Sequence, residues 1–421
     1  MAPARPVLVD ATRLLTRLRH RHPTGIDRVD LAYARRYLAR PEDGAVALTR
    51  FGARILPAER SRDLLARLEA RWRETVPAAA DPVLAGIRRR LAGEPRGAPT
   101  VPAGRGLRLP SVHVEAERLL LGAPLWRAAA AAPQGCVYLH TSHLRLDRPG
   151  LFAWLDRRPD IRPVFFVHDL IPIDYPEYGV PGEADRHRTR MATVARRAAA
   201  VIVNSDDVGS RLAAHLRREG LPVPSITTAP LGVETAFQGG LAAPSAGAGA
   251  PYFVACSTIE ARKNHLLLLQ VWRELAERLG PAVPKLVVVG RRGWESEAAA
   301  DLLDRCPALR EPVIEAASLS SAGLAELVAG ARALLMPSFA EGYGIPVVEA
   351  LSLGTPVIAS DIPAHREVAG GHATFLHPLD GTGWRDAVLA AAGRPRDTVE
   401  RYAPPTWEAH FAIADDVLAR L

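Results

Sequence analysis

The sequence is poor in cysteine and has no long apolar run, and each shortage excludes a class of protein. Its three cysteines, Cys136, Cys256 and Cys306, lie far apart and form no CxxC pair, so neither a disulfide framework nor a zinc site is expected. No apolar run reaches the ~18 residues that a membrane-spanning helix needs, and the N-terminus lacks the zones of a signal peptide. We therefore expect a cytoplasmic protein with reduced thiols.

Positive charge is concentrated in one half of the chain. Residues 1–250 hold 37 basic and 25 acidic residues, whereas the remainder hold 16 and 21, so the first half accounts for the net charge of +7. Such a half can dock on anionic lipid headgroups, grip a phosphate-bearing ligand or bind nucleic acid, or it is simply a solvated arginine-rich surface. Nucleic acid is the least favoured, because the basic residues are not interleaved with aromatic residues in a recognisable motif.

Length and apolar pattern favour two domains. The chain has 421 residues, of which 48% are apolar, and single cores stop growing at roughly 250 to 300 residues. Short apolar runs of strand type alternate with helical stretches, and the pattern starts twice, which indicates two parallel α/β layers. The runs are Pro6–Val9, Cys136–Leu139, Pro163–Val167, Ala200–Val203 and Ser225–Thr228, then Tyr252–Ala255, Lys285–Val289, Pro312–Glu315, Ala333–Met336 and Thr355–Ala359.

Composition also predicts where the domains divide. Residues 238–251 are almost wholly Gly, Ala, Pro and Ser, which is typical of a linker. We therefore predict a first domain over residues 1–240, a second over 251–405 and a terminal amphipathic helix over 406–421. Residues 76–109, rich in Pro, Gly, Ala and Arg, interrupt the first α/β pattern and predict an insertion or a mobile loop.

The most informative segment is residues 337–350, PSFAEGYGIPVVEA, which follows an apolar strand and opens a helix. Pro346 suits the first helical position, and Gly354 suits the position just past the helix end. Glycines before the helix let the backbone approach a ligand, and the free N–H groups of the helix N-terminus favour a diphosphate. Glu349, expected in the first turn, and Glu341, on the loop, can accept hydrogen bonds from sugar hydroxyls; alternatively they only complement the helix dipole and face solvent.

Glu341 and Glu349, within EGYGIPVVEA, resemble the EX7E motif of the retaining GT-B glycosyltransferases of family 4. Other segments are similar to that family in the same order along the chain, and the ordered set is more specific than any one motif. They are TGIDR at 24–28, HDLIP at 168–172, PLGV at 230–233, STIEARKN at 257–264 and VGR at 289–291. The resemblance implies an α/β GT-B fold, with two Rossmann-like domains, a cleft between them and a C-terminal helix that packs back on the first domain.

The same resemblance implies roles for individual residues. Arg262 and Lys263 are expected to neutralise the departing diphosphate at the end of a strand, and His168 and Glu341 complete the catalytic set. Lys263 is one of only two lysines, which favours a role for its compact charge; solvated cations are the alternative. The remaining donor-binding residues are expected to be Gly25, Ser257, Gly290, Arg291, Ser318, Leu319, Gly342, Tyr343, Gly344, Ile345 and Glu349.

The chemistry implied needs neither a cofactor nor a metal ion. No Asp-x-Asp motif occurs anywhere in the chain, so a metal-independent retaining transfer is expected. The HxxH pair, His140 and His143, has no acidic partner nearby and is assigned to the acceptor cleft or to packing. Asp169 is expected to cap a turn, and Arg28 either meets a phosphate or faces solvent.

The HDLIP and TGIDRV variants resemble those of bacterial surface-polysaccharide transferases that move mannose or rhamnose. This implies GDP-mannose as the first candidate for the nucleotide-sugar donor. The expected acceptor is a saccharide, and a lipid-diphosphate-linked saccharide at an anionic membrane surface suits the basic first half. The protein is then expected to be cytoplasmic and peripheral on the inner face of the membrane, with no nucleic-acid partner.

Other functions fit the sequence less well. An NAD-dependent oxidoreductase shares the α/β pattern, but no GxGxxG follows an early strand. A phosphorylase needs a pyridoxal phosphate lysine, and neither Lys263 nor Lys285 lies in such a context. A nucleotide-sugar epimerase or a catalytically silent binding protein of the same fold stays open as an alternative, although the complete set of charged residues argues against the silent form.

Overall fold

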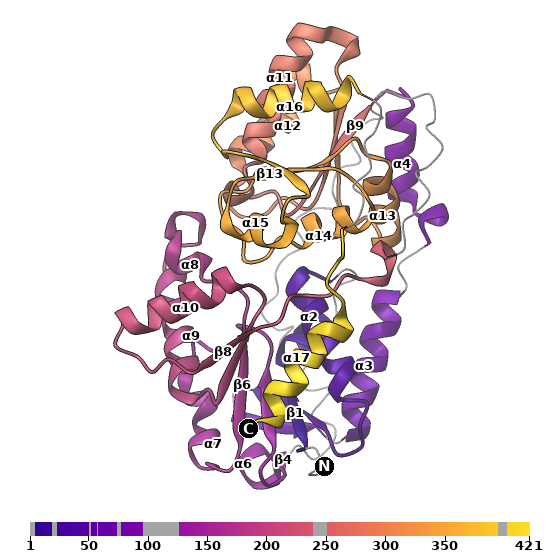
Figure 1. Ribbon diagram of the computed structural model, residues 1–421. Helices are drawn as coiled ribbons and strands as arrows, with labels where there is room; N and C mark the ends of the chain where they lie inside the picture. Colours follow the sequence, from indigo (N-terminus) through magenta and orange to yellow (C-terminus); the bar gives the residue numbers. More distant parts are fainter. Residues whose placement is uncertain are drawn as a thin grey trace.

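The computed structural model describes residues 5–18, 23–49, 52–56, 58–73, 77–95, 126–238, 251–394 and 402–421. These residues form two α/β domains, one stacked on the other (Figure 1). The alternation of strands and helices predicted from the sequence is therefore confirmed. Of the predicted linker, only Gln238 and Pro251 belong to the described residues.

The first domain contains an eight-stranded sheet of order β4-β3-β2-β1-β5-β6-β7-β8. Strands β2-β1-β5-β6-β7-β8 are parallel, as expected for runs of buried apolar residues. β3 and β4 are antiparallel and β4 forms the edge of the sheet; β2, β3 and β4 were not among the predicted strands. Two residues separate β2 from β3, and only an antiparallel pair can be joined so tightly. The strands are β1 Val7–Asp10, β2 Gly44–Thr49, β3 Gly52–Leu56, β4 Trp126–Arg127, β5 Val137–His140, β6 Arg162–Val167, β7 Ala200–Val203 and β8 Ser225–Thr228.

The second domain contains a six-stranded parallel sheet of order β11-β10-β9-β12-β13-β14. Its register places Val254 of β9 opposite Val287 of β10 and Leu334 of β12. The edge strand β14 was not predicted, because its side chains are partly exposed and a threonine interrupts its apolar residues. The strands are β9 Tyr252–Cys256, β10 Lys285–Val289, β11 Val313–Ala316, β12 Leu334–Met336, β13 Val357–Ser360 and β14 Ala373–Leu376.

Helices cover both sheets. In the first half of the chain they are α1 Thr12–Arg17, α2 Gly25–Tyr37, α3 Ala58–Arg73, α4 Pro82–Leu91, α6 Ala128–Ala131, α7 Ala153–Asp156, α8 Ile171–Asp174, α9 Glu183–Arg197 and α10 Asp206–Arg218. In the second half they are α11 His265–Leu279, α12 Glu297–Arg305, α13 Ser321–Gly330, α14 Ile345–Ser352, α15 Pro363–Ala369, α16 Gly381–Ala392 and α17 Trp407–Ala419. Short 3₁₀ turns include η1 Ala78–Ala80, η3 Pro176–Tyr178 and η5 Ala261–Lys263.

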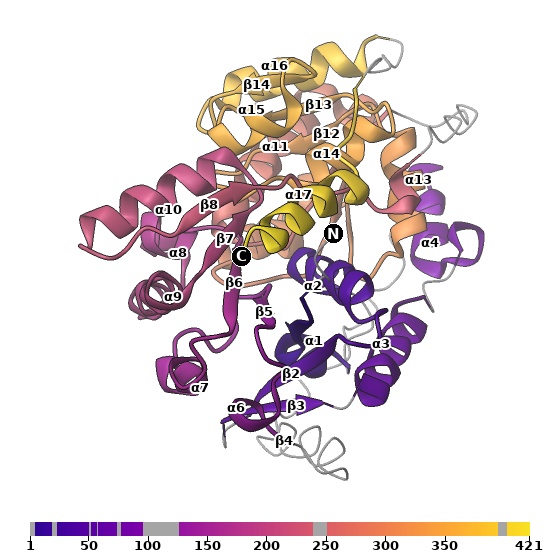
Figure 2. The same cartoon turned by 60° about the horizontal axis from the view of Figure 1, so that its bottom comes forward.

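The C-terminal helix α17 lies against the first domain, as predicted (Figures 1 and 2). Phe411 packs edge-to-face on Tyr33 of α2 with ring centroids 5.1 Å apart, and the Tyr37 hydroxyl donates a hydrogen bond of 2.8 Å to Asp415. The side chain of Thr406 caps the helix by accepting from the Ala409 N–H. Aromatic burial and several polar contacts, among them the buried one of 2.8 Å between His410 Nε2 and the Tyr33 hydroxyl, therefore hold the end of the chain on the first domain.

Residues 76–109 were predicted to form an insertion or a mobile loop, but part of this range is the helix α4. Residues 77–95 form η1 and α4, and they pack on β11 and α13 of the second domain, whereas residues 96–109 lie outside the described part. Asp81 caps α4 through the Val83 N–H and also accepts a hydrogen bond of 2.9 Å from the Ser320 N–H of the second domain. Leu84 is buried in this contact, because α4 has one apolar face that needs a partner.

Within the described part of the chain, every helix is too short or too polar to cross a bilayer.

Candidate active site

Arg262, Lys263 and Glu341 form one cluster at the carboxyl end of the second sheet. Lys263 Nζ donates to Glu341 Oε1 over 2.6 Å, and Arg262 Nη1 donates to Glu341 Oε2 over 3.1 Å. The Ser338 hydroxyl donates to Glu341 Oε1 over 2.7 Å. The cluster lies where open α/β sheets bind their ligands, and three of the four predicted catalytic residues therefore come together.

The local backbone explains how the two cations reach this position. After η5, Asn264 adopts a left-handed conformation with φ of 56°, which ends the turn and starts α11. Its side-chain amide donates to the carbonyl oxygens of Pro337 and Pro378, at 3.1 and 2.8 Å. The loop that carries Arg262 and Lys263 is thereby fixed to the segment that carries Glu341.

Charge in the cluster is strongly coupled. Burial alone would raise the pKa of Glu341, but the adjacent Lys263 and Arg262 hold it well below its usual range. Burial lowers the pKa of Lys263, and Glu341 opposes this shift. Glu341 is therefore a carboxylate at neutral pH, and Arg262 shares its charge with Glu260, 2.7 Å from Nη2.

Glu349 belongs to a second cluster that joins the domains. Arg28 of α2 donates from Nη1 to Glu349 Oε1 over 2.8 Å, and its Nε lies 3.1 Å from Glu234 Oε1. Burial raises the pKa of Glu349 to about 7, against the lowering effect of Arg28. The predicted position in the first helical turn is wrong, since α14 begins at Ile345 and places Glu349 in its second turn.

The two clusters are neighbours around the end of β9. Burial raises the pKa of the Cys256 thiol to about 12, and the negative charge of Glu349 adds to this shift. The positive charges of Arg28 and Lys263 oppose it. Residues from α2, β9, η5 and α14 therefore share one electrostatic environment between the domains.

The N-terminus of α14 has the form expected of an anion site. Its N-cap, Gly344, has φ of +102°, a left-handed conformation that favours glycine, and no side chain caps the helix. Ile345 lies against Gly25, whose Cβ would stand 3.1 Å from the Ile345 side chain. The Tyr343 side chain instead points into the protein, where its hydroxyl donates to the Leu231 carbonyl over 3.1 Å, so only the backbone of Tyr343 is placed to meet a ligand.

His168 lies across the interdomain gap from this loop. A Cβ on Gly342 would stand 2.5 Å from the His168 carbonyl oxygen, so the two domains touch here. The His168 ring donates from Nε2 to the Thr141 carbonyl over 2.7 Å, which leaves Nδ1 as the acceptor nitrogen. Burial lowers the pKa of His168 to about 4, so the ring is neutral at pH 7.

Other residues predicted to bind the donor follow the carboxyl ends of β9, β10 and β11. Ser257 and Gly290 belong to two touching loops, since a Cβ on Gly290 would stand 1.9 Å from the Ser257 carbonyl oxygen. Arg291 and Ser318 are exposed and Leu319 is half-buried. Ser318 has φ of 64°, an uncommon conformation for a residue with a side chain.

The histidines of the HxxH pair behave differently. His140 is fully buried, with Nδ1 3.1 Å from the Tyr138 hydroxyl and 3.4 Å from Asp10 Oδ2, which makes it a packing residue. His143 Nε2 accepts from the His168 N–H over 3.1 Å and so supports the site.

Asp169 caps its turn, as predicted, by accepting from the Ile171 N–H. The described residues contain no group of three or more His, Cys, Asp or Glu side chains arranged to hold a metal ion.

Some residues of the site gave no signal in the sequence. Ser338 lies inside the segment singled out, but a serine on a loop is too common to indicate a carboxylate partner. Glu367 of α15 accepts from the Asp206 and Asp207 N–H groups at the start of α10, over 2.6 and 3.1 Å. Such a cross-domain contact depends on how the domains dock, which no local pattern reveals.

Comparison with known proteins agrees with this geometry. Residues 250–393, about a third of the chain, match the family model described as Glycosyl transferases group 1. The matched stretch contains the whole second sheet and the loops that carry Arg262, Lys263, Glu341 and Glu349.

Two relatives are similar over part of their length. The serotype-specific mannosyltransferase WbdA of Escherichia coli is 29% identical over 233 residues, 50% of this chain and 27% of WbdA. O-antigen chain mannosyltransferase B of the same organism is 35% identical over 130 residues, 31% of this chain and 33% of that protein. The matches therefore span about a quarter to a third of these relatives.

One solved structure resembles almost the whole chain. Anabaena Alr3699/HepE, crystallised with UDP, superposes with a TM-score of 0.56 and 14% identity, over 99% of this chain and 95% of that one. The molecule has the GT-B fold. The α,α-trehalose 6-phosphate synthase of Burkholderia multivorans gives 0.51 and 12%, over 73% and 75% of the two chains, and agrees with this GT-B assignment.

Proposed function

We propose that this protein is a nucleotide-sugar-dependent glycosyltransferase that moves a sugar to a saccharide acceptor with retention of configuration. The observation that carries the proposal is the half-buried cluster of Arg262, Lys263 and Glu341 at the edge of the interdomain gap. Two cations beside the uncapped N-terminus of α14 suit a diphosphate, which bears its charge where cations and N–H groups converge.

The chemistry assigned to these residues is electrostatic. The bond between the acceptor oxygen and the sugar C1 forms as the bond from C1 to the phosphate oxygen breaks, and the hydroxyl proton passes to the departing phosphate. Arg262 and Lys263 stabilise the growing negative charge, which is the task of a metal ion in metal-dependent transferases. The neutral His168 orients the donor sugar by accepting a hydrogen bond at Nδ1. Arg28 turns from Glu349 toward the phosphates, and Glu349 then accepts hydrogen bonds from the ribose hydroxyls.

For the donor we propose GDP-mannose. Support comes from the names of the relatives, which are mannosyltransferases of O-antigen or serotype-specific polysaccharide. We propose a bacterial surface polysaccharide as the product and a lipid-diphosphate-linked saccharide as the acceptor. The basic first half of the chain suits attachment to the inner, anionic face of a membrane.

Thermal-shift measurements with GDP, UDP, dTDP and ADP test the donor, because a ligand that binds only the folded protein raises its stability with occupancy. We expect the largest rise in melting temperature with GDP. Release of GDP from GDP-mannose is then measured with and without a mannoside acceptor, in buffer with and without EDTA. Equal rates with EDTA support metal independence; a larger shift with another nucleotide would replace the donor, and no transfer from any of the four donor classes would overturn the activity.

A further inference from the structure

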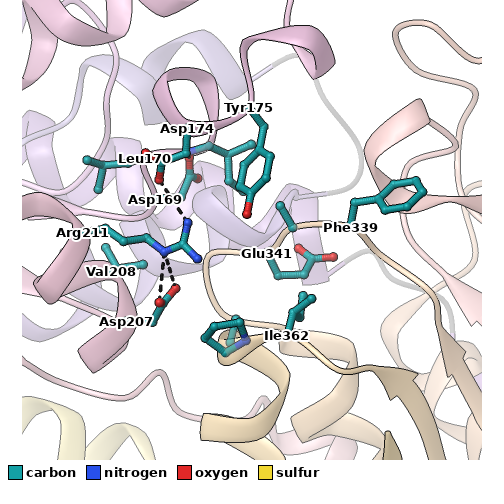
Figure 3. Close-up of a pocket in the computed structure, with 14 residues that line it drawn as sticks. Asp169, Leu170, Asp174, Tyr175, Asp207, Val208, Arg211, Phe339, Glu341 and Ile362 are labelled. Atoms are coloured by element: carbon teal, nitrogen blue, oxygen red, sulfur yellow. Dashed lines mark hydrogen bonds and ion pairs between the residues drawn. The ribbon is translucent and has the colours of Figure 1, made fainter. Parts of the chain in front are cut away.

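A pocket between the domains lies beside Glu341 and has no place in the donor site described above. The first domain contributes Asp169, Asp174, Tyr175 and Arg211, and the second contributes Phe339 and Glu341 (Figure 3). The view shows Arg211 and the acidic residues of the first domain on one side, facing the loop of Phe339 and Glu341 on the other. The pocket therefore opens next to the carboxylate assigned to the donor sugar.

Arg211 is held in a fixed orientation. Its Nε donates to Asp207 Oδ1 over 3.0 Å along α10, and its Nη1 donates to Asp174 Oδ2 over 3.2 Å, from α8 (Figure 3). A guanidinium fixed by two carboxylates presents its remaining N–H groups in one plane. Oxygen acceptors and N–H donors thus alternate on this wall, a pattern that suits the neighbouring hydroxyls of a sugar.

Aromatic rings form another part of the wall. Phe339 is stacked on Tyr178 with ring centroids 5.8 Å apart and an interplanar angle of 10°. Phe339 and Tyr175 both line the pocket. Flat apolar rings beside a few oriented polar groups are the usual composition of a site for a small hydroxylated ligand.

The charge balance favours a neutral ligand. Among the described residues that line the pocket, Arg211 is the one cation, and Asp174 and Asp207 already balance it. Lys263 and Arg262, which pair with Glu341, are assigned to the diphosphate of the donor and so supply no cation for a second anion in the pocket. A phosphate or carboxylate on the ligand would therefore meet carboxylates without a spare cation.

The pocket depends on the docked arrangement of the domains. Close by, Glu367 of the second domain accepts from the N–H groups that begin α10, and Ser205 Oγ donates to the Gly342 carbonyl over 3.1 Å. Separation of the domains would move Phe339 and Glu341 away from Arg211. A ligand held by both walls therefore favours the docked state.

We propose that this pocket binds the terminal hexose of the acceptor as a neutral pyranose, with Arg211 and Asp174 binding its hydroxyls and Phe339 and Tyr175 contacting its apolar faces. The proposal rests on the transferase function proposed above and adds the place and the charge class of the acceptor. Glu341 then borders both the donor sugar and the acceptor, so the two reacting groups meet beside it.

The test uses p-nitrophenyl α-mannoside as a neutral acceptor and its 6-phosphate as the charged counterpart. Ligand-observed NMR measures their binding without turnover, and GDP release measures KM for donor and acceptor separately. Arg211→Ala and the milder Asp174→Asn are compared with Arg188→Ala, which removes an arginine from an exposed pair on α9 of the same domain.

We expect Arg211→Ala and Asp174→Asn to weaken binding of the neutral mannoside about tenfold or more, as the loss of a hydrogen bond to a charged group does. The donor KM and the thermal shift with nucleotide should stay within twofold, as in Arg188→Ala. The 6-phosphate should bind the unsubstituted protein at least tenfold more weakly than the neutral mannoside.

Other results have distinct meanings. Binding of the mannoside that requires Arg211, in a protein without transferase activity, supports the site and overturns the proposed function. Transfer that is equally efficient in Arg211→Ala and Asp174→Asn overturns the site and leaves the function standing. A raised donor KM with an unchanged acceptor KM assigns the pocket to the donor sugar and also overturns the proposal.

Discussion

At the scale of residues, the two glutamates of EX7E spacing lie in opposite electrostatic environments. Glu341 meets two cations of its own domain and stays ionised, whereas Glu349 meets one arginine from the other domain and is half-neutralised near pH 7. Burial is similar for both side chains, at 8 and 6% exposed. The number of neighbouring cations, and the domain that supplies them, therefore set the charge of each glutamate. This difference agrees with the proposal that Glu341 meets the donor sugar and Glu349 the ribose.

Replacement of Lys263 tests the stabilisation of the leaving group. Lys263→Ala should lower kcat about 10²–10³-fold, the usual cost of one preorganised electrostatic donor, while circular dichroism and a cooperative melt show an intact fold. Lys285→Ala is the matched control, because Lys285 is the other lysine and its ammonium group donates to the Glu311 carbonyl over 2.9 Å at the surface, away from the cluster. Turnover of Lys263→Ala equal to that of the control would contradict the role.

The raised pKa of Glu349 makes stability depend on pH. The folded protein holds this proton up to about pH 7, whereas the unfolded chain loses it near the ordinary glutamate pKa of 4.5. Folding thus takes up a proton between these values, so stability falls as pH rises from about 4.5 to 7, by at most about 3 kcal/mol. Glu349→Gln lacks this proton equilibrium.

We therefore expect the free energy of unfolding of Glu349→Gln, relative to the unsubstituted protein, to be higher at pH 8 than at pH 5. Urea denaturation at the two values measures it. Asp30, whose pKa burial also raises to about 7, is present in both proteins and cancels in the difference. A difference that does not change with pH would show that Glu349 is ionised throughout.

At the scale of elements, the loop before α14 joins the two domains by close backbone contact. Gly342→Ala would place a Cβ 2.5 Å from the His168 carbonyl oxygen and 2.9 Å from the Asp169 Cβ, and backbone cannot move aside cheaply. We expect this variant to lose at least tenfold in kcat with nucleotide binding preserved. Gly371→Ala, where a Cβ meets nothing within 4 Å, should be unaffected; equal activity in both variants would show that the domains need not dock this closely.

Most elements with a continuous apolar run could be predicted from the sequence. β7 and β10 were predicted with their observed bounds, because composition marks a buried parallel strand, and β8 was predicted with its observed bounds although its side chains are partly exposed. β2, β3, β4 and β14 were not predicted. β14 is a partly exposed edge strand, and the antiparallel pairing of β3 and β4 is decided by their partners, whereas β2 has a buried apolar run and was still not among the predicted strands. Among the candidate site residues, the grouping of Arg262, Lys263 and Glu341 could be predicted from motif spacing. Ser338 carries no local signal although its contact with Glu341 lies within one loop, and the place of Arg211 opposite Glu341 depends on the docking of the domains.

At the scale of the whole molecule, one carboxylate supports the docked arrangement from across the gap. Glu367 of α15 accepts two N–H groups at the N-terminus of α10, where a negative charge is worth about 0.3–1 kcal/mol. Glu367→Gln should lower the ratio of docked to separated domains by about two- to fivefold, measured as a larger radius of gyration in solution scattering.

Glu277→Gln is the control for this change, because Glu277 forms an exposed pair with Arg273 on α11 within one domain. We expect its radius of gyration to equal that of the unsubstituted protein. If Glu367→Gln also leaves the radius of gyration unchanged, the other contacts between the domains hold them together without the Glu367 carboxylate.

The path of α4 has a consequence for how the protein could be divided. The chain passes from the first domain to the second at α4, returns, passes again after β8 and returns with α17. A gene cut between residues 238 and 251 would therefore encode two incomplete fragments: the first lacks α17 and carries α4 without its partners β11 and α13, and the second lacks α4 and carries α17 without a surface to rest on. Co-expressed, each fragment would supply a missing piece of the other, so the two products should be recoverable as a complex but not singly.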